Sequence, residues 1–386
     1  MINSDRLADT FKSLAEIDSV STQEKDIRIK IQNLFDAMGA ETLVDDSMAE
    51  TGSNTGNLIV KFKGNRWVPA LLFNGHMDTV DPGRGVKVLF NDGVFTSDGT
   101  TILGSDDKSA IAILIEVMKT IRERDLPHGP IELVFTVCEE IGLSGAKHLD
   151  TRLIDATFGY SLDAADTEAV VTRAPAANRI DFKILGKDAH AGSSPESGVN
   201  AIVAASRAIA AIPRLGRIDS ETTCNIGVVQ GGIASNIVPK LVTVQGEARS
   251  HNQEKLDAIT QEIVSTVEKV IEEEKKRFPG MGLPTVEFEI ESHFPVKHIP
   301  DDHPVVELAR QAAQNLGRSF RTKTTGGGTD ANIFTQKGIV TGVLGTGMTD
   351  VHTVRESVKL DDMVRSAELV LEIIRIHSEK EVQVHG

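Results

Sequence analysis

The chain has 386 residues, which is enough for two domains that each bury a hydrophobic core. Its contents of 40% apolar and 25% charged residues are those of an ordinary globular protein. The formal net charge is −15, from 56 acidic and 41 basic residues. This balance argues against nucleic acid or an anionic membrane as a partner, because both are bound through basic patches.

The cysteines and the N-terminal segment indicate the compartment. Cys138 and Cys224 are far apart in the sequence and show no metal-binding spacing, which favours a reduced protein without a disulfide framework. The N-terminal segment lacks the basic and then apolar order of a signal peptide. No apolar run approaches the roughly 18 residues that a membrane-spanning helix needs. We therefore expect a cytoplasmic protein.

Residues 1–177 alternate between helical and strand-like patterns. Apolar residues near helical spacing predict helices over residues 24–39 and 107–123. Strand-type runs lie at 57–63, 69–74, 131–137 and 158–162. Several of these runs are continuously apolar, which is typical of strands covered on both faces. The alternation predicts a catalytic domain of the α/β class, built on a doubly wound mixed sheet.

Residues 178–292 follow a different order. Their patterns predict, in turn, a strand, a helix, two strands, a long helix and a strand, at 179–185, 198–212, 223–229, 237–247, 253–278 and 285–291. The order β-α-β-β-α-β is that of a ferredoxin-like domain. We therefore predict that residues 178–292 form an inserted second domain.

Residues 293–386 return to the α/β pattern. They predict a helix, a tight glycine turn, a short helix, a strand and a final helix, at 303–316, 326–328, 331–336, 339–344 and 360–378. The catalytic domain is thus predicted to be discontinuous, with residues 1–177 as its first part and 293–386 as its second.

Five residues with metal-ligand chemistry lie where predicted strands end or helices begin. They are His76, Asp106, Glu140, Asp163 and His352. Open α/β sheets bind ligands beyond the carboxyl ends of their strands, so these side chains are expected to converge. Imidazole and carboxylate ligands without thiolate suit zinc, cobalt or manganese at a hydrolytic centre. This set supplies two divalent ions only if one carboxylate bridges them, with a position left for a bridging water or hydroxide.

Two further acidic residues adjoin these ligands. Glu139 precedes Glu140, and adjacent side chains on a turn point in different directions, so one can ligate while the other acts as general base. Asp78, two residues after His76, is placed to accept the second imidazole N–H and so fix the tautomer of that ring.

Each motif also has an interpretation without function. An isolated His-x-Asp is more often a polar pair, a Glu-Glu pair is usually solvated, and Asp106-Asp107-Lys108 suits a helix N-terminus. Cys138 is more simply a small buried residue that closes a strand than a nucleophile. Phosphate binding at the glycine turn is weakly indicated, since no Walker lysine follows. The coincidence of five such residues at the strand ends of one pattern favours the metal site.

Taken in order, the motifs resemble a known family. The co-catalytic dizinc exopeptidases, which include peptidase T, carboxypeptidase G and the aminoacylases, have motifs similar to Gly75-His76-Met77-Asp78-Thr79, Gly104-Ser105-Asp106-Asp107-Lys108-Ser109, Glu139-Glu140-Ile141-Gly142, Leu162-Asp163-Ala164 and the late His352. The resemblance covers nearly the whole chain and is closest to peptidase T-like proteins.

The resemblance implies how the five ligands are shared. It places His76 and Asp163 on one metal ion, Glu140 and His352 on the other, and Asp106 as the bridge between them. It further implies that the peptide bond after Asp106 is cis.

The resemblance also implies roles for residues that are not metal ligands. It makes Glu139 the general base and Asp78 an orienting group behind the metal. The inserted domain resembles the family's lid, which often forms homodimers, and His190 resembles the lid histidine that helps polarise the scissile carbonyl. Asn236 and Arg249 resemble its pair of substrate-contacting residues.

The glycine turn bears on substrate recognition. The peptidase T branch has Arg-Gly-Gly-Thr-Asp where this chain has Gly326-Gly327-Gly328-Thr329-Asp330, so that arginine is absent. The turn that begins at Gly328 and enters a helix still offers backbone N–H groups to an anionic substrate end.

Three functions remain open from the sequence. The first is hydrolysis of amide bonds in short peptides by an aminopeptidase or tripeptidase-like enzyme, in which hydroxide on the metals attacks the carbonyl while Glu139 accepts its proton. The second is deacylation or desuccinylation of N-acyl amino acids at the same centre. The third is a catalytically silent metal-binding or peptide-binding relative, which would have no chemical need for Glu139.

Overall fold

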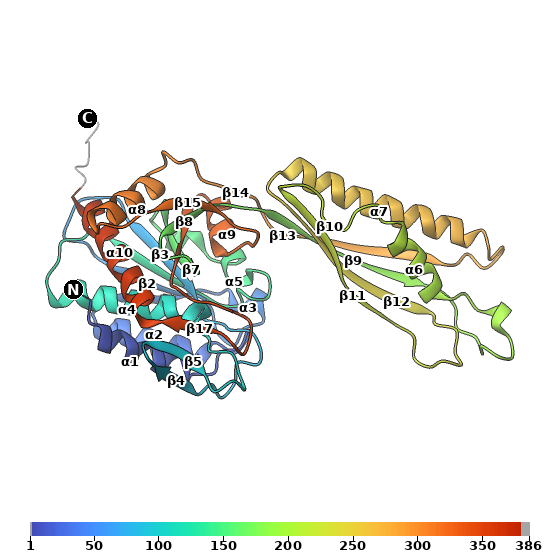
Figure 1. Cartoon of the computed structure of the whole chain (residues 1–386), viewed down its shortest axis with the longest axis horizontal. Helices are drawn as coiled ribbons and strands as arrows, with labels where there is room; N and C mark the ends of the chain where they lie inside the picture. Colours follow the sequence, from blue (N-terminus) through green and yellow to red (C-terminus); the bar gives the residue numbers. More distant parts are fainter. Residues whose placement is uncertain (1, 380–386) are drawn as a thin grey trace. The chain divides into compact units, whose positions relative to one another are not determined.

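The computed structural model describes residues 2–379, which form two compact units (Figure 1). Unit 1 comprises residues 2–173, 297–325 and 329–379, and unit 2 comprises residues 174–296 and 326–328. These bounds lie a few residues from the predicted domain boundaries, and the glycine turn groups with unit 2 rather than with the rest of the second catalytic part. Within residues 2–379, no helix is both long enough and apolar enough to cross a membrane.

Unit 1 is built on a nine-stranded mixed sheet. Its strands lie in the order β1 (Glu41–Val44), β2 (Leu58–Phe62), β6 (Ile131–Thr136), β3 (Leu71–His76), β7 (Phe158–Ala164), β16 (Val340–Gly345), β8 (Ala169–Ala174) and β14 (Lys297–His298), with β15 (Arg321–Thr324) paired to β8. The four central strands β6, β3, β7 and β16 are parallel. The strands β1 and β2 pair antiparallel to their neighbours, and β8 pairs antiparallel to β16 but parallel to β15. The predicted α/β class and mixed sheet are confirmed.

Both faces of this sheet are covered. One face shares the main hydrophobic cluster with α1 (Ser4–Ala15), α2 (Lys25–Ala37), α4 (Ser105–Glu123), α8 (Pro304–Asn315) and α10 (Leu360–Ser378). The other face carries α9 (Asp330–Gln336), whose Ala331 packs with Val171 and Val343. Because apolar side chains are buried on both sides, the central strands read as continuous apolar runs.

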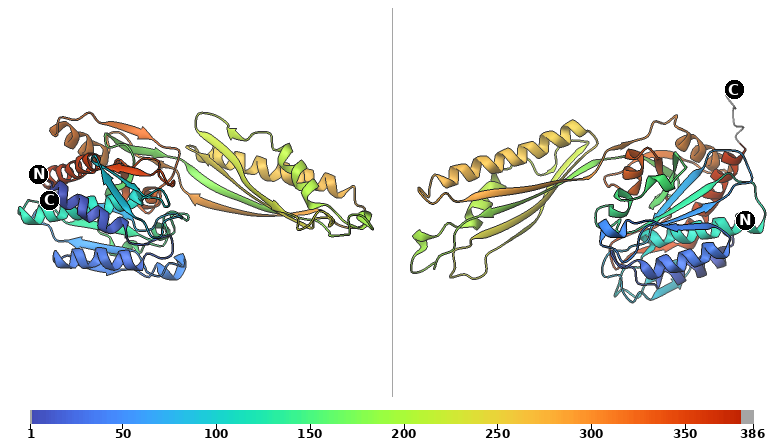
Figure 2. Two further views of the ribbon diagram at one scale, coloured as in Figure 1. Left: turned by 60° about the horizontal axis from the view of Figure 1, so that its bottom comes forward. Right: turned by 180° about the vertical axis from the view of Figure 1, so that it is seen from behind.

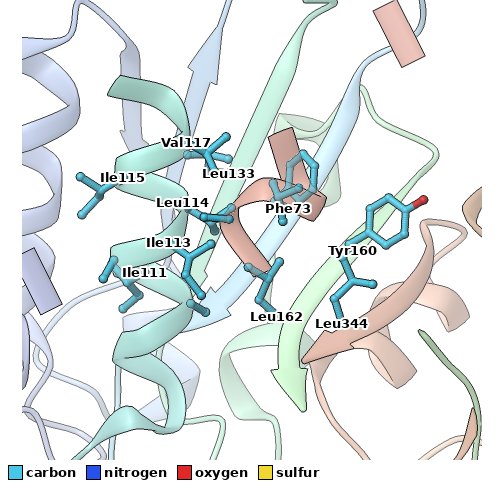
Figure 3. Close-up of a cluster of buried hydrophobic side chains, with 14 of the residues drawn as sticks. Phe73, Ile111, Ile113, Leu114, Ile115, Val117, Leu133, Tyr160, Leu162 and Leu344 are labelled. Carbon is cyan, nitrogen blue, oxygen red and sulfur yellow. The ribbon is translucent and has the colours of Figure 1, made fainter. Parts of the chain in front are cut away.

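The centre of the main cluster lies between α4 and the parallel strands (Figure 3). The side chains of Ile113 and Leu114 from α4 lie near Phe73 of β3 and Leu162 of β7 (Figure 3). The last helix, α10, contacts both α4 and α8, so the C-terminal part of the chain closes the same core as the N-terminal part.

Short elements complete unit 1. A three-stranded sheet has the order β17 (Ser357–Lys359), β5 (Val94–Ser97) and β4 (Val88–Asn91). The helices α3 (Met48–Thr51) and α5 (Ser144–Lys147) and a 3-10 turn at Thr151–Leu153 lie between the larger elements. Through β17, the segment that follows residue 352 is tied to β5 by three residue pairs.

Unit 2 is a five-stranded antiparallel sheet with two helices along it (Figure 2). Its strands lie in the order β10 (Gly216–Arg217), β11 (Thr222–Gly231), β12 (Leu241–Ser250), β9 (Ala176–Leu185) and β13 (Thr285–Phe294). The helices α6 (Ala201–Ala211) and α7 (Gln253–Lys275) contact each other and share one hydrophobic cluster with the sheet. Apart from the short β10 at the edge, the strand order and pairing are those of the ferredoxin-like arrangement.

One helix and one strand of unit 2 begin later in the sequence than predicted. The helix predicted from Gly198 begins at Ala201, because the side chain of Asn200 accepts a hydrogen bond from the Val203 N–H at 3.1 Å and caps the helix. The strand predicted over 237–247 begins only at Leu241, since the residues before it form loop contacts instead of a regular ladder.

Truncation of a core residue of α4 tests this packing. Leu114 is 1% exposed, and Leu114→Ala is expected to lower the free energy of unfolding by about 3 kcal/mol, through lost burial and an unfilled cavity. Ile29→Ala, at a helix position that is 38% exposed, is the matched control and should lower it by less than about 1 kcal/mol. Urea unfolding followed by circular dichroism measures both, and equal losses would contradict the packing described.

Candidate metal centre

The five predicted ligands meet in unit 1. The carboxylate of Asp106 lies between the two imidazoles, with Oδ1 3.0 Å from His76 Nε2 and Oδ2 3.2 Å from His352 Nε2. His352 Nε2 also lies 2.9 Å from Glu140 Oε1. The set His76, Asp106 and Glu140, and the set Asp106, Asp107 and Asp163, each offer ligand atoms within 4.8 Å of one another. Asp106 contacts both imidazoles and belongs to both sets.

The parallel strands explain why these residues converge. His76 is the last residue of β3, Asp163 lies near the end of β7, and Glu140 follows the end of β6. In the register, Asn74 of β3 lies opposite Ser161 of β7, so His76 and Asp163 emerge at the same height and on the same face of the sheet. This is the carboxyl edge, where open α/β sheets form their sites.

Asp106 and Asp107 stand at a break in the first turn of α4. Both have non-helical backbone angles, and the peptide bond between them is cis, as the resemblance implies. The Asp107 carboxylate accepts a hydrogen bond from the His76 backbone N–H at 3.2 Å. Gly75 permits this approach, because a Cβ there would lie 2.9 Å from Asp107 Oδ2 and 3.1 Å from the Ala110 Cβ.

The cluster holds more acidic than basic side chains, and most of them are buried. Burial raises the pKa of Asp163 well above its ordinary value, and the nearby Asp106 raises it further. Burial likewise raises the pKa of Glu140. Burial alone would also raise the pKa of Asp106, but hydrogen bonds from His352 and His76 hold it below its ordinary value. Hydrogen bonds to Asp106 and Glu140 raise the pKa of His352 to about 10.

The donor set therefore fits divalent metal ions. It consists of imidazole nitrogens and carboxylate oxygens, and contains no thiolate. The buried carboxylates gain most from a compact positive charge, since isolated buried anions are costly. One buried oxygen near the ligands, Asp107 Oδ1, has no hydrogen-bond partner among the described residues.

Asp78 contacts both the His76 ring and the segment that carries Glu139 and Glu140. Its backbone carbonyl, rather than its carboxylate, lies closest to the His76 ring, 2.9 Å from Nδ1, while carboxylate Oδ1 lies 3.4 Å from that nitrogen. Donation from Nδ1 leaves the Nε2 lone pair directed at Asp106. The Asp78 carboxylate accepts the backbone N–H groups of Glu139 at 2.9 Å and Glu140 at 3.2 Å, and the Ser21 hydroxyl at 2.7 Å. One buried carboxylate thus holds the segment that carries both glutamates.

Glu139 points into the same buried region. It is 8% exposed, and burial raises its pKa well above the ordinary value, with Asp163 and Asp330 contributing in the same direction. The His76 charge acts in the opposite sense. A buried carboxyl beside a ligand cluster is placed to act as a general base.

A buried polar layer lies beneath the ligands, and the sequence patterns did not indicate it. The Ser161 hydroxyl donates to Asn74 Oδ1 at 2.7 Å, and Asn74 Nδ2 donates to Asp330 Oδ2 at 3.3 Å. The Thr136 hydroxyl donates to the same Asp330 oxygen. Burial raises the pKa of Asp330 to about 6. These residues join the strands β3, β6 and β7 just before their ligands, which fixes the spacing of those strand ends.

The predicted residues His190 and Asn236 meet in unit 2. The backbone N–H of Ala191 donates to the Asn236 carbonyl at 2.9 Å, and both predicted side chains are exposed. His190 Nδ1 accepts the backbone N–H groups of Gly192 and Ser193, each at 3.1 Å. In the neutral ring the proton is therefore on Nε2, which is available as a hydrogen-bond donor.

Arg249 and the glycine turn also meet in unit 2. Arg249 is paired with Glu247 through two parallel contacts, at 3.0 and 2.9 Å, and donates to the Gly326 carbonyl at 3.2 Å. Its guanidinium lies 5.9 Å from the centre of the Phe294 ring. A side chain at Gly328 would collide with that ring, because a Cβ would lie 2.5 Å from it. The close packing of the turn on Phe294 explains the need for glycine at position 328.

Comparison with known proteins gives a consistent answer. The model of the family described as Peptidase family M20/M25/M40 matches residues 72–376. The protein YqjE of Bacillus subtilis is 40% identical over 375 residues, which cover 97% of this chain and 99% of that relative.

Two solved structures resemble the whole chain. An aminopeptidase PepT from Bacillus cereus has 40% sequence identity and a TM-score of 0.86, with 98% of this chain and 100% of that chain covered. A tripeptidase from Staphylococcus aureus has 39% identity and a TM-score of 0.91, with the same coverage of 98% and 100%.

The charge of His352 gives a prediction for the metal-free protein. Asp106 and Glu140 raise the pKa of His352 from 6.5 to about 10. The contribution of the charged imidazole to the free energy of unfolding is therefore fully present below pH 6.5 and is lost as the pH rises toward about 10. The melting temperature of the metal-free chain should therefore exceed that of metal-free His352→Gln at low pH, by a margin that shrinks across this window. A margin that does not change with pH would contradict the paired imidazolium.

Proposed function

The chain belongs to peptidase family M20/M25/M40 and is a metallo-exopeptidase, and from this premise we propose that it removes the amino-terminal residue of short peptides with two divalent metal ions. The observation that carries the proposal is the contact of both imidazoles with different oxygens of Asp106. The similarity to an aminopeptidase and a tripeptidase, each near 40% identity over almost the full chain, supports the choice of substrate class.

We infer that zinc is the native metal and that Asp106 bridges the two ions. His76 and Asp163 then hold one ion, and Glu140 and His352 hold the other. The division is supported by His352, which contacts Glu140 and Asp106 through the same nitrogen, and by Asp163, which has a ligand atom within 4.8 Å of one of Asp106. When bound, two such ions polarise the scissile carbonyl and acidify the attacking water.

In this proposal Glu139 moves the proton. It accepts a proton from the attacking water and delivers that proton to the leaving amine, which keeps the overall proton count balanced. Two features support the assignment. The Glu139 carboxyl is buried beside the ligands, and the Asp78 carboxylate accepts the Glu139 N–H at 2.9 Å, so the backbone that carries the base is fixed.

The proposed substrate contacts come from unit 2. His190 donates from Nε2 to the carbonyl oxygen of the scissile bond, a role supported by the two backbone N–H groups that occupy Nδ1. Asn236 contacts the peptide beside it, and Arg249 with the turn at Gly328 binds an anionic part of the substrate. The Glu247 carboxylate already pairs with Arg249, so this subsite carries less positive charge than a free guanidinium would.

Removal of the base tests the proton transfer. Glu139→Gln keeps the shape of the side chain but cannot accept a proton, so kcat on a tripeptide is expected to fall by about 10²–10⁴-fold. Metal content per chain, measured by elemental analysis, should stay equal to that of the wild type. Glu307→Gln, a change at an exposed position of α8, is the matched control and should leave both quantities unchanged. Wild-type turnover in Glu139→Gln would contradict the assignment.

A substrate panel tests the exopeptidase class. Free tripeptides are expected to be cleaved after their first residue, with kcat/KM at least about 10²-fold above that for the same peptides with an acetylated amino terminus. Product analysis by mass spectrometry gives the position of cleavage. Preferential hydrolysis of N-acyl amino acids would replace the proposed function with that of a deacylase, and absence of all hydrolysis in the metal-loaded protein would indicate a silent relative.

A further inference from the structure

A buried carboxylate that is not a predicted ligand holds the turn before Asp106. Glu356 is 1% exposed, and its two oxygens accept four hydrogen bonds from residues 103–106. Oε2 accepts the backbone N–H groups of Leu103 at 2.8 Å and Gly104 at 2.9 Å. Oε1 accepts the Ser105 hydroxyl at 2.6 Å and the Asp106 N–H at 3.0 Å. These donors fill the acceptor capacity of one carboxylate.

Glu356 belongs to the loop that carries His352. The loop is closed at its base by Thr349 and Ser357, which exchange backbone hydrogen bonds of 2.9 and 3.0 Å. Glu356 lies at this base, next to Ser357, and His352 lies at the far part of the loop. The His352 side chain is 50% exposed, and its Nε2 atom contacts Glu140 and Asp106. The placement of the ring therefore depends on where the loop is anchored.

The interaction requires a carboxylate. No ion pair of Glu356 is found among the described residues, and its negative charge is satisfied by N–H groups at the start of α4, where a helix favours anions. If glutamine replaced Glu356, its NH₂ group would take the place of one carboxylate oxygen. That group would then face donors from residues 103–106 instead of accepting hydrogen bonds from them. The Glu356 carboxylate therefore connects two segments that lie about 250 residues apart in the sequence.

We propose that Glu356 is a positioning residue that fixes the His352 loop to the turn of Asp106 and thereby sets the affinity for the metal ion that His352 holds. The inference rests on the proposed two-metal function. Groups that orient a ligand without touching the metal commonly change metal affinity by 10–100-fold when they are removed. The Asp106 N–H is one of its four partners, so the loop that carries His352 is fixed directly to the turn before Asp106.

A matched control separates this role from simple stability. Glu132 is also a buried carboxylate, 2% exposed, and accepts the backbone N–H groups of Asp155 and Ala156 at 3.0 and 2.9 Å. It also forms an ion pair with Lys61 at 2.8 Å. Glu132 stands near the start of β6, whereas the ligands follow the end of that strand. Glu132→Gln therefore disturbs a similar network remote from the metal ligands.

The experiment is calorimetric titration of the metal-free full-length chain with Zn²⁺. Relative to wild type, Glu356→Gln should weaken one of the two binding steps by about 10–100-fold and change the other by less than about threefold. Glu132→Gln should leave both steps unchanged, even if its melting temperature falls. Ser105→Ala, which removes one of the four donors, is a milder variant and should weaken the same step by a smaller factor.

Coupling to His352 gives the decisive readout. In a His352→Ala background, Glu356→Gln should cause no further loss of zinc affinity, because there is no imidazole left to position. Additive losses, or equal zinc affinities of wild type and Glu356→Gln at both steps, would overturn the positioning role. A wild type that binds one zinc ion per chain would instead contradict the proposed two-metal function, and the two failures are thus distinguishable.

Discussion

The sharing of the Asp106 carboxylate by two imidazoles is the interaction on which the rest of unit 1 depends. Oδ1 faces His76 and Oδ2 faces His352, at 3.0 and 3.2 Å, although the two histidines are separated by most of the chain. A carboxylate that serves two partners must have its backbone held in place, and the segments that carry those partners must arrive from opposite directions. The parallel strands bring one histidine, and the loop closed beside β17 brings the other.

Carboxylates that are not predicted ligands fix much of the backbone that carries the ligands. Asp78 accepts the N–H groups of Glu139 and Glu140, Asp107 accepts that of His76, and Glu356 accepts that of Asp106. An ionised carboxylate has only acceptors, so it binds exposed N–H groups at irregular backbone without a competing donor. The cost is a large amount of buried negative charge, seen in the raised pKa values of Asp163 and Glu139. Bound divalent cations offset that charge, which joins the stability of the site to its occupancy.

Much of the architecture could be predicted from the sequence, because long apolar strands and amphipathic helices carry clear periodicity. The five ligand positions could be named because each combines a strand end or helix start with the right chemistry. Contacts that depend on turn geometry could not be predicted. The carbonyl of Asp78 rather than its carboxylate lies closest to His76, and this follows from the local backbone path. Asp330 and Glu356 carried no signal, since their partners lie far away in the sequence and each is a single acidic residue in a loop or at a helix end.

The most direct test of the central claim is a crystal of the chain grown with zinc and examined by anomalous scattering. The account predicts two zinc peaks roughly 3.5–4 Å apart, with one Asp106 oxygen on each ion. His76 is expected on one ion, and His352 together with Glu140 on the other. A single peak at full zinc occupancy, or two peaks with the His352 ring bound to neither, would contradict it.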